Sequence, residues 1–422
     1  MPIRLNPFNP NSPVNPGMFV GRLSEVERVE QGLLQTRAGK PGHFMITGER
    51  GIGKSSLLLY LKSVAEGGIN IDGKTLKFLF VDVDIDDTST QRGLVERIQL
   101  ALNRQLGSSE PARKFLGEAW EFLQRVRIMD SGIEAAAKGR ADEVMLDEFA
   151  HSIAQVALRT CEGTDTSLFG AKYDGILILI DEADNCSREL RLGSFLKLLV
   201  ERLQRHGCNR LIIGLAGLPE LRKKLYASHP SSLRIFEEIQ LGRLSEVEID
   251  SVIRICLDEA NQTNEQKTEI TQSARKSLFT FSEGYPHFVQ QFGYSAFASD
   301  TDGLIDDRDV AKGAAGERGA LDLIGDRYYR NDFYNKIQSD SLRTVLRIMA
   351  GNLDGWVTRQ RIGDEFEGKT SVLNNALKAL RDRHIILSKE GARGVYRLQH
   401  KGFAHWINLN KGREKLGIQV ND

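Results

Sequence analysis

The stretch HFMITGERGIGKSSLLLYL, residues 43–61, joins a short apolar run to an apolar helix through a glycine-rich turn. The turn at residues 48–55 follows the pattern G-x-x-x-x-G-K-S. Glycine permits backbone conformations in which successive N–H groups point inward, and a following helix adds the positive end of its dipole. A loop of this kind between a strand and a helix holds phosphate, so the sequence predicts a phosphate-binding loop here.

The residue types in this loop predict a nucleotide with its metal ion, and we expect ATP and Mg²⁺ as ligands. Lys54 is expected to reach the β- and γ-phosphates, and the Ser55 hydroxyl to bind Mg²⁺. The residues predicted to bind the nucleotide in this segment are Gly48, Glu49, Arg50, Gly51, Ile52, Gly53, Lys54, Ser55 and Ser56.

A second motif, ILILIDEAD at residues 176–184, places two carboxylates at the end of a buried strand. We expect Asp181 to hold Mg²⁺ through its water. Glu182 is expected to orient and deprotonate the water that attacks the γ-phosphate. A protein that only binds phosphate does not need Glu182, so the motif favours hydrolysis. The sequence thus predicts a Mg-dependent ATPase with Lys54 and Glu182 as catalytic residues.

The apolar pattern predicts an α/β fold. Continuous apolar runs, rather than alternating ones, are typical of central strands in a parallel sheet that is covered on both faces. Such runs occur at 43–48, 76–85, 175–181 and 210–217, and helical patterns separate them. We therefore predict a P-loop NTPase domain over residues 18–240, with a helical insertion at 107–150.

The helix that opens this domain is expected to carry a capping box. Ser24 can cap it, and Glu27 follows three residues later, as that motif requires. Residues 1–17 are rich in proline and asparagine and lack periodicity, which predicts an extended lead-in without regular structure.

Two further domains are predicted after the α/β domain. Residues 241–330 show helical patterns throughout, which indicates an all-helical domain. Residues 336–410 show three helices followed by two β-runs around the turn GARG, which is the order of a winged helix.

Charge and composition restrict the classes of partner. The chain carries 57 basic and 57 acidic residues, which argues against indiscriminate coating of nucleic acid. Residues 336–422 hold 16 basic and nine acidic residues, a net charge of +7, so a nucleic-acid surface is expected there. No apolar run suits a membrane helix and no signal-peptide pattern opens the chain, so we expect a cytoplasmic protein that does not bind membranes. The four scattered cysteines are expected to be thiols.

Four motifs, MFVGRLSEVERV, GERGIGKSSLL, ILILIDEAD and GYPHFVQ, occur in that order before the predicted winged helix. Over roughly residues 18–400 the chain resembles the AAA+ ATPases of the group that contains replication-origin initiators, transposition and secretion ATPases, and STAND signalling ATPases. The resemblance implies that Phe19, Val20, Gly21 and Arg22 lie against the adenine, although Phe19 could instead be a core residue. It also implies that Pro286 and His287, in the lid element, lie near the nucleotide, although the proline could equally be a structural bend.

The resemblance also raises two questions about catalysis. In this group the fourth strand ends in a polar residue that positions the attacking water, but here the strand ends in Ala216, Gly217 and Leu218. We therefore expect turnover that is slow or stimulated by a partner. Arg234 lies where the group places an arginine finger, which would act in a neighbouring subunit's site and make the protein a homo-oligomer. A surface or intrachain salt bridge is the alternative for Arg234.

The third helix of the predicted winged helix suggests contact with double-stranded DNA. Its apolar stripe is expected to include Val372. Asparagine and lysine suit base edges and phosphates in the major groove. A protein-docking role is the open alternative, because many winged helices bind proteins. The residues predicted to contact nucleic acid are Lys369, Asn374, Asn375, Lys378, Arg381 and, at the wing, Arg393.

Three functions remain open from the sequence. The leading hypothesis is an AAA+ ATPase that assembles on binding nucleotide and engages DNA or a separately encoded protein partner, as a regulator or loader in transposition, replication or defence against mobile DNA. The second is a STAND-like switch that hydrolyses ATP slowly and does not contact DNA. The third is a scaffold that assembles with nucleotide into filaments or rings.

Overall fold

The computed structural model describes residues 4–123, 135–161, 168–330, 333, 337, 339–352, 355–383, 385–389 and 391–415. The chain divides into two compact units, a sheet unit and a helical unit. The sheet unit is Pro13–Gly242. The helical unit combines Arg243–Asp422 with Met1–Ser12.

A parallel sheet with strand order β2-β3-β4-β1-β5 forms the centre of the sheet unit. The apolar runs predicted as strands are all found in it. The edge strand β5 was not predicted, because its sequence EEIQ buries only Ile239 and so lacks an apolar run. The strands are β1 (Phe44–Thr47), β2 (Phe78–Asp84), β3 (Gly175–Asp181), β4 (Leu211–Gly217) and β5 (Glu237–Gln240).

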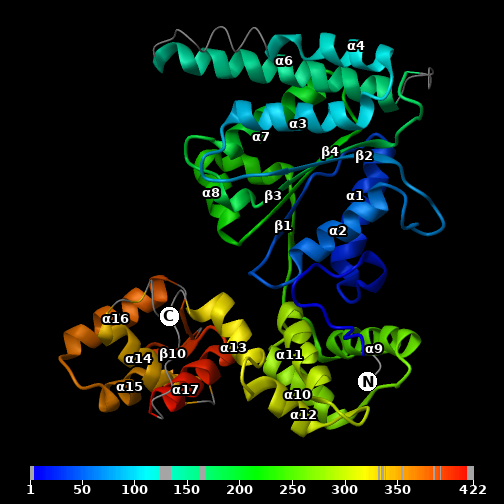
Figure 1. The fold of residues 1–422 in the computed structure, drawn as a ribbon. Coiled ribbons are helices and arrows are strands. Elements are labelled where there is room, and N and C mark those ends of the chain that lie inside the picture. Colours follow the sequence, from blue (N-terminus) through cyan, green and yellow to red (C-terminus); the bar gives the residue numbers. More distant parts are fainter. Residues whose placement is uncertain are drawn as a thin grey trace. The chain divides into compact units, whose positions relative to one another are not determined.

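Helices cover both faces of this sheet (Figure 1). Ile176, Ile178 and Ile180 of β3 belong to the large core shared with α3, α6 and α7. Side chains alternate along a strand, so Leu177 and Leu179 point to the opposite face, where α1 and α2 lie. This α/β layering is the predicted P-loop NTPase fold. The helices are α1 (Leu23–Arg37), α2 (Lys54–Ala65), α3 (Gln91–Leu106), α7 (Leu192–Arg205) and α8 (Glu220–Ser228), with short 3-10 turns η1 (Pro16–Met18), η2 (Ala183–Asn185) and η3 (Pro230–Ile235).

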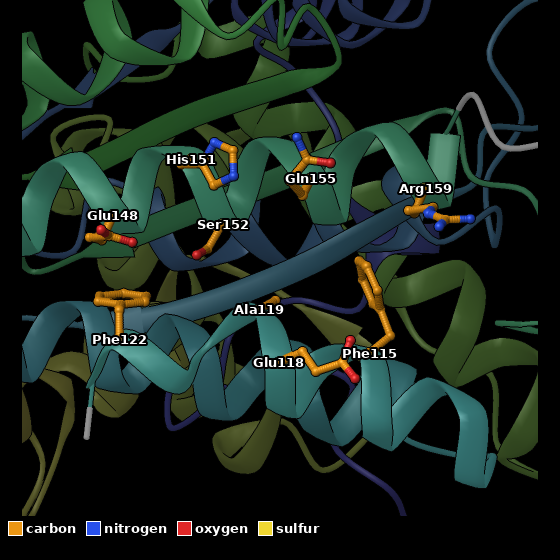
Figure 2. Close-up of a pocket in the computed structure, with 9 residues that line it drawn as sticks. All are labelled: Phe115, Glu118, Ala119, Phe122, Glu148, His151, Ser152, Gln155 and Arg159. Carbon is orange, nitrogen blue, oxygen red and sulfur yellow. The ribbon is translucent and has the colours of Figure 1, made fainter. Parts of the chain in front are cut away.

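The predicted helical insertion contains α4 (Glu110–Ala119) and much of the long helix α6 (Ala135–Cys161). Residues 124–134 of the predicted insertion lie outside the described residues. A pocket of about 240 Å³ lies between α4 and α6 (Figure 2). Its lining is Phe115, Glu118, Ala119, Phe122, Glu148, His151, Ser152, Gln155 and Arg159.

The helical unit begins with a helical part in which α9 carries a complete capping box. The Ser245 hydroxyl accepts the N–H of Glu248, and the Glu248 carboxylate accepts the N–H of Ser245. The elements are α9 (Glu246–Thr263), β6 (Glu269–Ile270), α10 (Gln272–Ser282), α11 (Pro286–Ser299), β7 (Leu304–Ile305), α12 (Asp307–Ala315), α13 (Ala320–Ile324) and the π-helical turn η4 (Gly325–Tyr329). The short parallel pair β6–β7 adds strand structure to a region that the sequence predicted as all-helical.

The extended N-terminal residues pack onto this part of the unit. The ring of Phe8 is buried against α11, where Gly293 leaves room for it: a Cβ at Gly293 would lie 2.5 Å from the ring. Arg4 lies over the ring of Phe297 and forms an ion pair with Asp300. Residues 4–15 of the lead-in thus form no helix or strand, the turn η1 begins at Pro16, and the segment contributes to a core.

The last part of the chain has the order helix, short strand, helix, helix and two strands, with a further helix after them. Strand order in its antiparallel sheet is β8-β10-β9. The elements are α14 (Asp340–Ala350), β8 (Val357–Thr358), α15 (Arg359–Glu365), α16 (Thr370–Asp382), β9 (Ile386–Ser388), β10 (Val395–Leu398) and α17 (Lys401–Lys415). The prediction for Val372 was wrong: it is 40% exposed, because it lies beside rather than on the stripe formed by Leu373, Ala376, Leu377 and Leu380.

Within the described part of the chain, no helix combines the length and apolar character needed to cross a bilayer. The cysteines, Cys161, Cys186, Cys208 and Cys256, are all described and all buried as thiols, as predicted.

Candidate active site

The glycine-rich loop connects β1 to α2, as its sequence requires. Gly51 and Gly53 have φ angles of 74° and 97°, in the left-handed region that side chains disfavour. Gly48 is buried, and a Cβ there would lie 2.7 Å from the Ile52 side chain. The backbone angles at Gly51 and Gly53 and the close contact at Gly48 therefore favour glycine at all three positions. With these glycines the loop can present its N–H groups at the start of α2.

Lys54 opens α2 and folds back over the loop. Its Nζ donates to the carbonyl oxygens of Gly48 at 2.8 Å and Glu49 at 3.1 Å. Burial lowers the pKa of Lys54, while the carboxylates of Asp184 and Asp181 act to raise it. The ammonium thus lies between the loop and the acidic ends of the neighbouring strands, where a nucleotide's phosphates would meet it.

The two serines that follow Lys54 differ in their surroundings. Ser55 is exposed, so its hydroxyl is accessible to a metal ion. Ser56 is buried, and its Oγ accepts the N–H of Val14 at 3.2 Å. Ser56 therefore holds the N-terminal segment of the sheet unit against α2, and its predicted contact with nucleotide stays a prediction.

Carboxylates gather where β2 and β3 end. Asp84 and Asp181 are direct partners in the parallel register of these strands. Burial raises the pKa of Asp181. The N–H of Glu182 donates to Asp181 Oδ1 at 2.8 Å and opposes this rise. The nearby negative charges of Asp82, Asp84 and Glu182 raise the pKa further. A nearby cation would relieve this repulsion.

These residues fit Mg²⁺ as P-loop proteins hold it. No group of three or more acidic, histidine or cysteine side chains forms a metal cage among the described residues. Mg²⁺ usually takes one or two protein ligands plus water and substrate phosphates, and Ser55 and Asp181 provide that kind of partial site.

Glu182 follows β3 in the left-handed conformation, with φ of 49°. Its side chain is exposed, and its Oε2 accepts a hydrogen bond from Asn185 Nδ2 at 3.0 Å. The carboxylate is therefore held outside the sheet, near the end of β3, where a water molecule can reach it.

Asp184, which the sequence analysis did not single out, contacts the end of the neighbouring strand. Its Oδ1 accepts the N–H of Leu218 at 2.8 Å. A Cβ on Gly217 would lie 2.7 Å from the same oxygen. A carboxylate thus lies at the end of β4, where the strand itself supplies no polar side chain. In the sequence, this carboxylate was indicated only by the acidic residue that ends the motif ILILIDEAD.

The FVGR segment is built around a buried arginine. Arg22 is 4% exposed, and its Nη2 donates to the carbonyl oxygens of Ile52 at 2.6 Å and Gly242 at 2.8 Å. Its backbone is left-handed, with φ of 57°, so α1 begins at Leu23. The predicted Ser24 cap is therefore wrong: Ser24 lies inside the first turn and makes no capping hydrogen bond.

Phe19 stacks on Tyr60 of α2, with ring centroids 5.4 Å apart and the rings inclined by 27°. Val20 and Gly21 connect it to Arg22 and are half-buried. Phe19 is also half-buried, so this arrangement leaves both the adenine contact and the core role open for it.

The remaining predicted catalytic and lid residues belong to η3 and α11. Arg234 is exposed in η3 and forms no hydrogen bond or ion pair within the described residues. Pro286 and His287 begin α11 in the helical unit. Burial, together with Arg327, lowers the pKa of His287 to about 4, so its imidazole is neutral at pH 7.

The side chains predicted to contact nucleic acid are exposed along α16, at its N-cap and in the turn between β9 and β10. Asn374 Oδ1 accepts a hydrogen bond from Arg359 Nε at 2.9 Å, and the N–H of Arg359 donates to the carbonyl of Gly394. Arg359 of α15 thus contacts both α16 and the turn between β9 and β10. The exposed residues are Lys369, Asn374, Asn375, Lys378, Arg381 and Arg393.

Comparison with known proteins agrees with this site. Residues 18–213 match the family model of the AAA ATPase domain, AAA_16. No curated protein matches the sequence.

Among solved structures, the ORC2 protein of Aeropyrum pernix in ADPNP-ADP complexes is 14% identical, with a TM-score of 0.51 over 98% of each chain. The CDC6P of Pyrobaculum aerophilum is 12% identical, covering 96% of this chain and 99% of its own, with a TM-score of 0.39. A mutant of RuvB from Thermotoga maritima is 12% identical, covering 97% of this chain and 99% of its own, with a TM-score of 0.41.

The similarity to ORC2 shows a shared fold. The family match, the P-loop between β1 and α2, and the acidic ends of β2 and β3 agree with one another. The segment 18–213 therefore matches the AAA ATPase domain in sequence, and its fold and the geometry of its loop agree with that match.

Proposed function

We propose that this chain binds ATP with Mg²⁺ at the P-loop and hydrolyses it. The observation that carries the proposal is the convergence of Lys54 on the loop carbonyls with Asp181 and Glu182 at the end of β3.

In this proposal each residue has one task. The loop N–H groups and Lys54 hold the phosphates and offset the charge that develops on the γ-phosphoryl group. Ser55 and Asp181 would hold Mg²⁺, which when bound neutralises phosphate charge. Glu182 orients a water molecule and accepts its proton, since its carboxylate is exposed and anchored by Asn185.

The substitution Glu182→Gln tests the assignment of the base. We expect kcat for ATP to fall about 10²–10⁴-fold while the Kd for ATP changes little, because general-base catalysis contributes that much and binding does not use the base. The matched control is Glu189→Gln, at an exposed glutamate seven residues along. Unchanged turnover in Glu182→Gln would show that the assignment is wrong.

We also propose that Arg234 acts in the site of a neighbouring subunit of a homo-oligomer. It is exposed and has no partner among the described residues, so its guanidinium is available to another chain. An arginine supplied in this way contributes about 10³–10⁵ in rate.

A mixing experiment tests this directly. Arg234→Ala has an intact P-loop but no finger, and Lys54→Ala has the finger but an inactive P-loop. Each alone should be nearly inactive, and a mixture should recover ATP turnover, because the mixed interface combines an intact loop with an intact arginine. A mixture that stays inactive would place Arg234 outside the neighbouring site.

For the helical unit we propose a lid over residues 241–330 and a winged helix over residues 336–410 that contacts double-stranded DNA. Three exposed basic residues support the DNA contact: Lys369 at the N-cap of α16, Lys378 within α16, and Arg393 of the proposed wing. The net charge of this end supports it as well. Such a protein would serve as a regulator or loader in replication, transposition or defence against mobile DNA.

Binding to double-stranded DNA is measured by fluorescence anisotropy at several salt concentrations. Lys378→Ala should weaken binding to all sequences and reduce the slope of log K against log salt by about one, because one phosphate contact is lost. The control is Lys223→Ala, an exposed lysine in α8 of the sheet unit. If the wild-type chain does not bind DNA, the winged helix is assigned to a protein partner.

The alternative is a nucleotide-dependent signalling switch with slow hydrolysis and no contact with DNA. It is favoured by the end of β4, where Ala216 and Gly217 are buried and carry no polar side chain. Nucleotide retained through purification, together with negligible turnover at every protein concentration, would support this function over the first.

A further inference from the structure

A carboxylate from a different element contacts the end of β4. Asp184 lies in η2, directly after β3, and its Oδ1 accepts the N–H of Leu218. Gly217 has no Cβ, and one added there would lie 2.7 Å from that oxygen and 3.1 Å from the Asp184 nitrogen. The glycine and the aspartate therefore fit together as a pair: the missing side chain on β4 makes room for the carboxylate.

The same carboxylate acts on the P-loop lysine. Burial lowers the pKa of Lys54, and the carboxylates of Asp184 and Asp181 oppose this by stabilising the ammonium form. Asp184 thus faces two parts of the site at once: through Oδ1 it holds the end of β4, and through its charge it interacts with the residue expected to bind the γ-phosphate.

The segment after Leu218 forms a tightly packed block with the helix that precedes β4. Leu218 O accepts the N–H of Leu221 in the first turn of α8. At the other end of α8, Ser228 O accepts a hydrogen bond from Ser194 Oγ of α7.

The turn η3 is fastened to α8 as well. Ser232 Oγ donates to the carbonyl oxygens of Leu225 at 3.1 Å and His229 at 2.7 Å. Gly193 of α7 approaches Leu225 so closely that a Cβ would lie 2.5 Å from its carbonyl oxygen. Since interiors packed this closely move as units, a shift at Leu218 would be carried through α8 to η3, on which Arg234 lies.

We propose that Asp184 is a positioning residue that responds to the γ-phosphate of bound ATP. Its response shifts α8 and η3, which move together. It takes over at the end of β4 the task that a polar strand residue would perform. The proposal rests on the proposed binding of ATP at the P-loop. ATP, unlike ADP, brings an anionic γ-phosphate to Lys54, and this changes the charge that the Asp184 carboxylate faces. The hydrogen bond to Leu218 converts that change into a movement of α8 and, with it, of Arg234.

The substitution Asp184→Asn separates the two contacts. The amide oxygen still accepts the N–H of Leu218, so folding is kept, but the charge that faces Lys54 is lost. We expect the ratio of the Kd for ADP to the Kd for a non-hydrolysable ATP analogue to rise about tenfold, because one repulsive charge near the γ-phosphate has been removed. A residue with only a structural role would leave this ratio unchanged. The control is Asp87→Asn, at an exposed carboxylate after β2 that forms no hydrogen bond or ion pair with the rest of the described chain.

Hydrogen exchange gives the second readout. In the wild-type chain, protection of residues 218–235 should differ between the ATP-analogue and ADP complexes, and Asp184→Asn should abolish that difference. Equal protection in the two wild-type complexes, or a difference that persists in Asp184→Asn with an unchanged affinity ratio, would overturn the inference. Either result leaves ATP binding established, whereas a wild-type chain that binds neither nucleotide overturns the proposed function itself.

Discussion

At the scale of single residues, several buried polar side chains act on the backbone rather than on a ligand. His43 and Arg22 are the clearest cases, because each satisfies main-chain groups that belong to distant parts of the sequence. Burying such a side chain costs free energy unless its hydrogen bonds are formed, so these contacts define where strands and loops meet.

His43 should make the sheet unit sensitive to acid. Its Nδ1 accepts the N–H of Ile213 at 3.0 Å, and burial lowers its pKa from 6.5 to about 4. Because the folded state binds this proton more weakly than the unfolded state, the stabilisation is fully present above pH 6.5 and is lost as the pH falls towards 4. The loss corresponds to about 3 kcal/mol.

This prediction is checked by hydrogen exchange of the β1 and β4 amides between pH 7.5 and 4.5, corrected for intrinsic rates. The variant His43→Asn retains an acceptor but does not titrate, so its protection should depend less on pH than that of the wild type. Identical pH profiles for the two proteins would contradict the role given to His43.

Arg22 should stabilise the P-loop. Arg22→Ala removes hydrogen bonds from a charged donor to the carbonyl oxygens of Ile52 and Gly242, which should cost about 2–3 kcal/mol and weaken ATP binding. Arg22→Lys should recover only part of this, because one ammonium cannot reproduce the guanidinium fork. Arg37→Ala, which removes a partly exposed ion pair with Asp174 at the other end of α1, should cost less than about 1 kcal/mol. Urea unfolding and nucleotide titration measure both effects.

At the scale of elements, one sequence pattern occurs twice with different outcomes. Both Ser24 and Ser245 are followed three residues later by glutamate. Ser245 forms a capping box at α9, whereas Ser24 lies within the first turn of α1, because the anchored Arg22 is the N-cap and starts the helix two residues earlier than a Ser24 cap would. A local pattern therefore specifies a cap only where no tertiary contact fixes the chain first.

This difference can be measured with a matched pair of substitutions. Ser245→Ala should destabilise α9 by about 1 kcal/mol, since it loses a side-chain cap, and Ser24→Ala should have little effect or slightly increase stability, since alanine suits a helical position. Unfolding free energies of the two variants give the comparison. Equal losses would show that Ser24 caps α1 in solution.

Local sequence patterns predicted only the elements that form without long-range contacts. The strands β1 to β4 and the P-loop follow from local apolar runs and from the glycine pattern, so the sequence identified them. β5 escaped detection because an edge strand with two glutamates has no apolar run. The role of Asp184 could not be predicted either, because its contact with Leu218 joins elements separated by 34 residues.

At the scale of the whole molecule, the helical unit is built from both ends of the described chain. Phe8 is 2% exposed in that unit, although most of the unit begins only at Arg243. The core of the unit thus depends on a residue that precedes the entire sheet unit in the sequence.

Phe8→Ala should therefore destabilise the helical unit by about 3–5 kcal/mol, as expected for a large side chain removed from a core. Gly293→Ala should cost about 1–3 kcal/mol, because the added methyl group overlaps the Phe8 ring. The control is Leu5→Ala, at a side chain that is 56% exposed. Exchange protection of α11 reports on this unit alone, and protection that is unchanged in Phe8→Ala would rule out the packing role.

This arrangement has a consequence for synthesis on the ribosome. Phe8 emerges long before α11, and at about 5–20 residues per second the delay is roughly 15–60 seconds. During that time the sheet unit can complete its fold, whereas the Phe8 ring stays exposed to solvent. Pro7 and Pro10 flank the ring, and proline disfavours the strand pairing through which nascent chains aggregate. The proline-rich composition of this segment thus protects a core residue until the structure that receives it has been made.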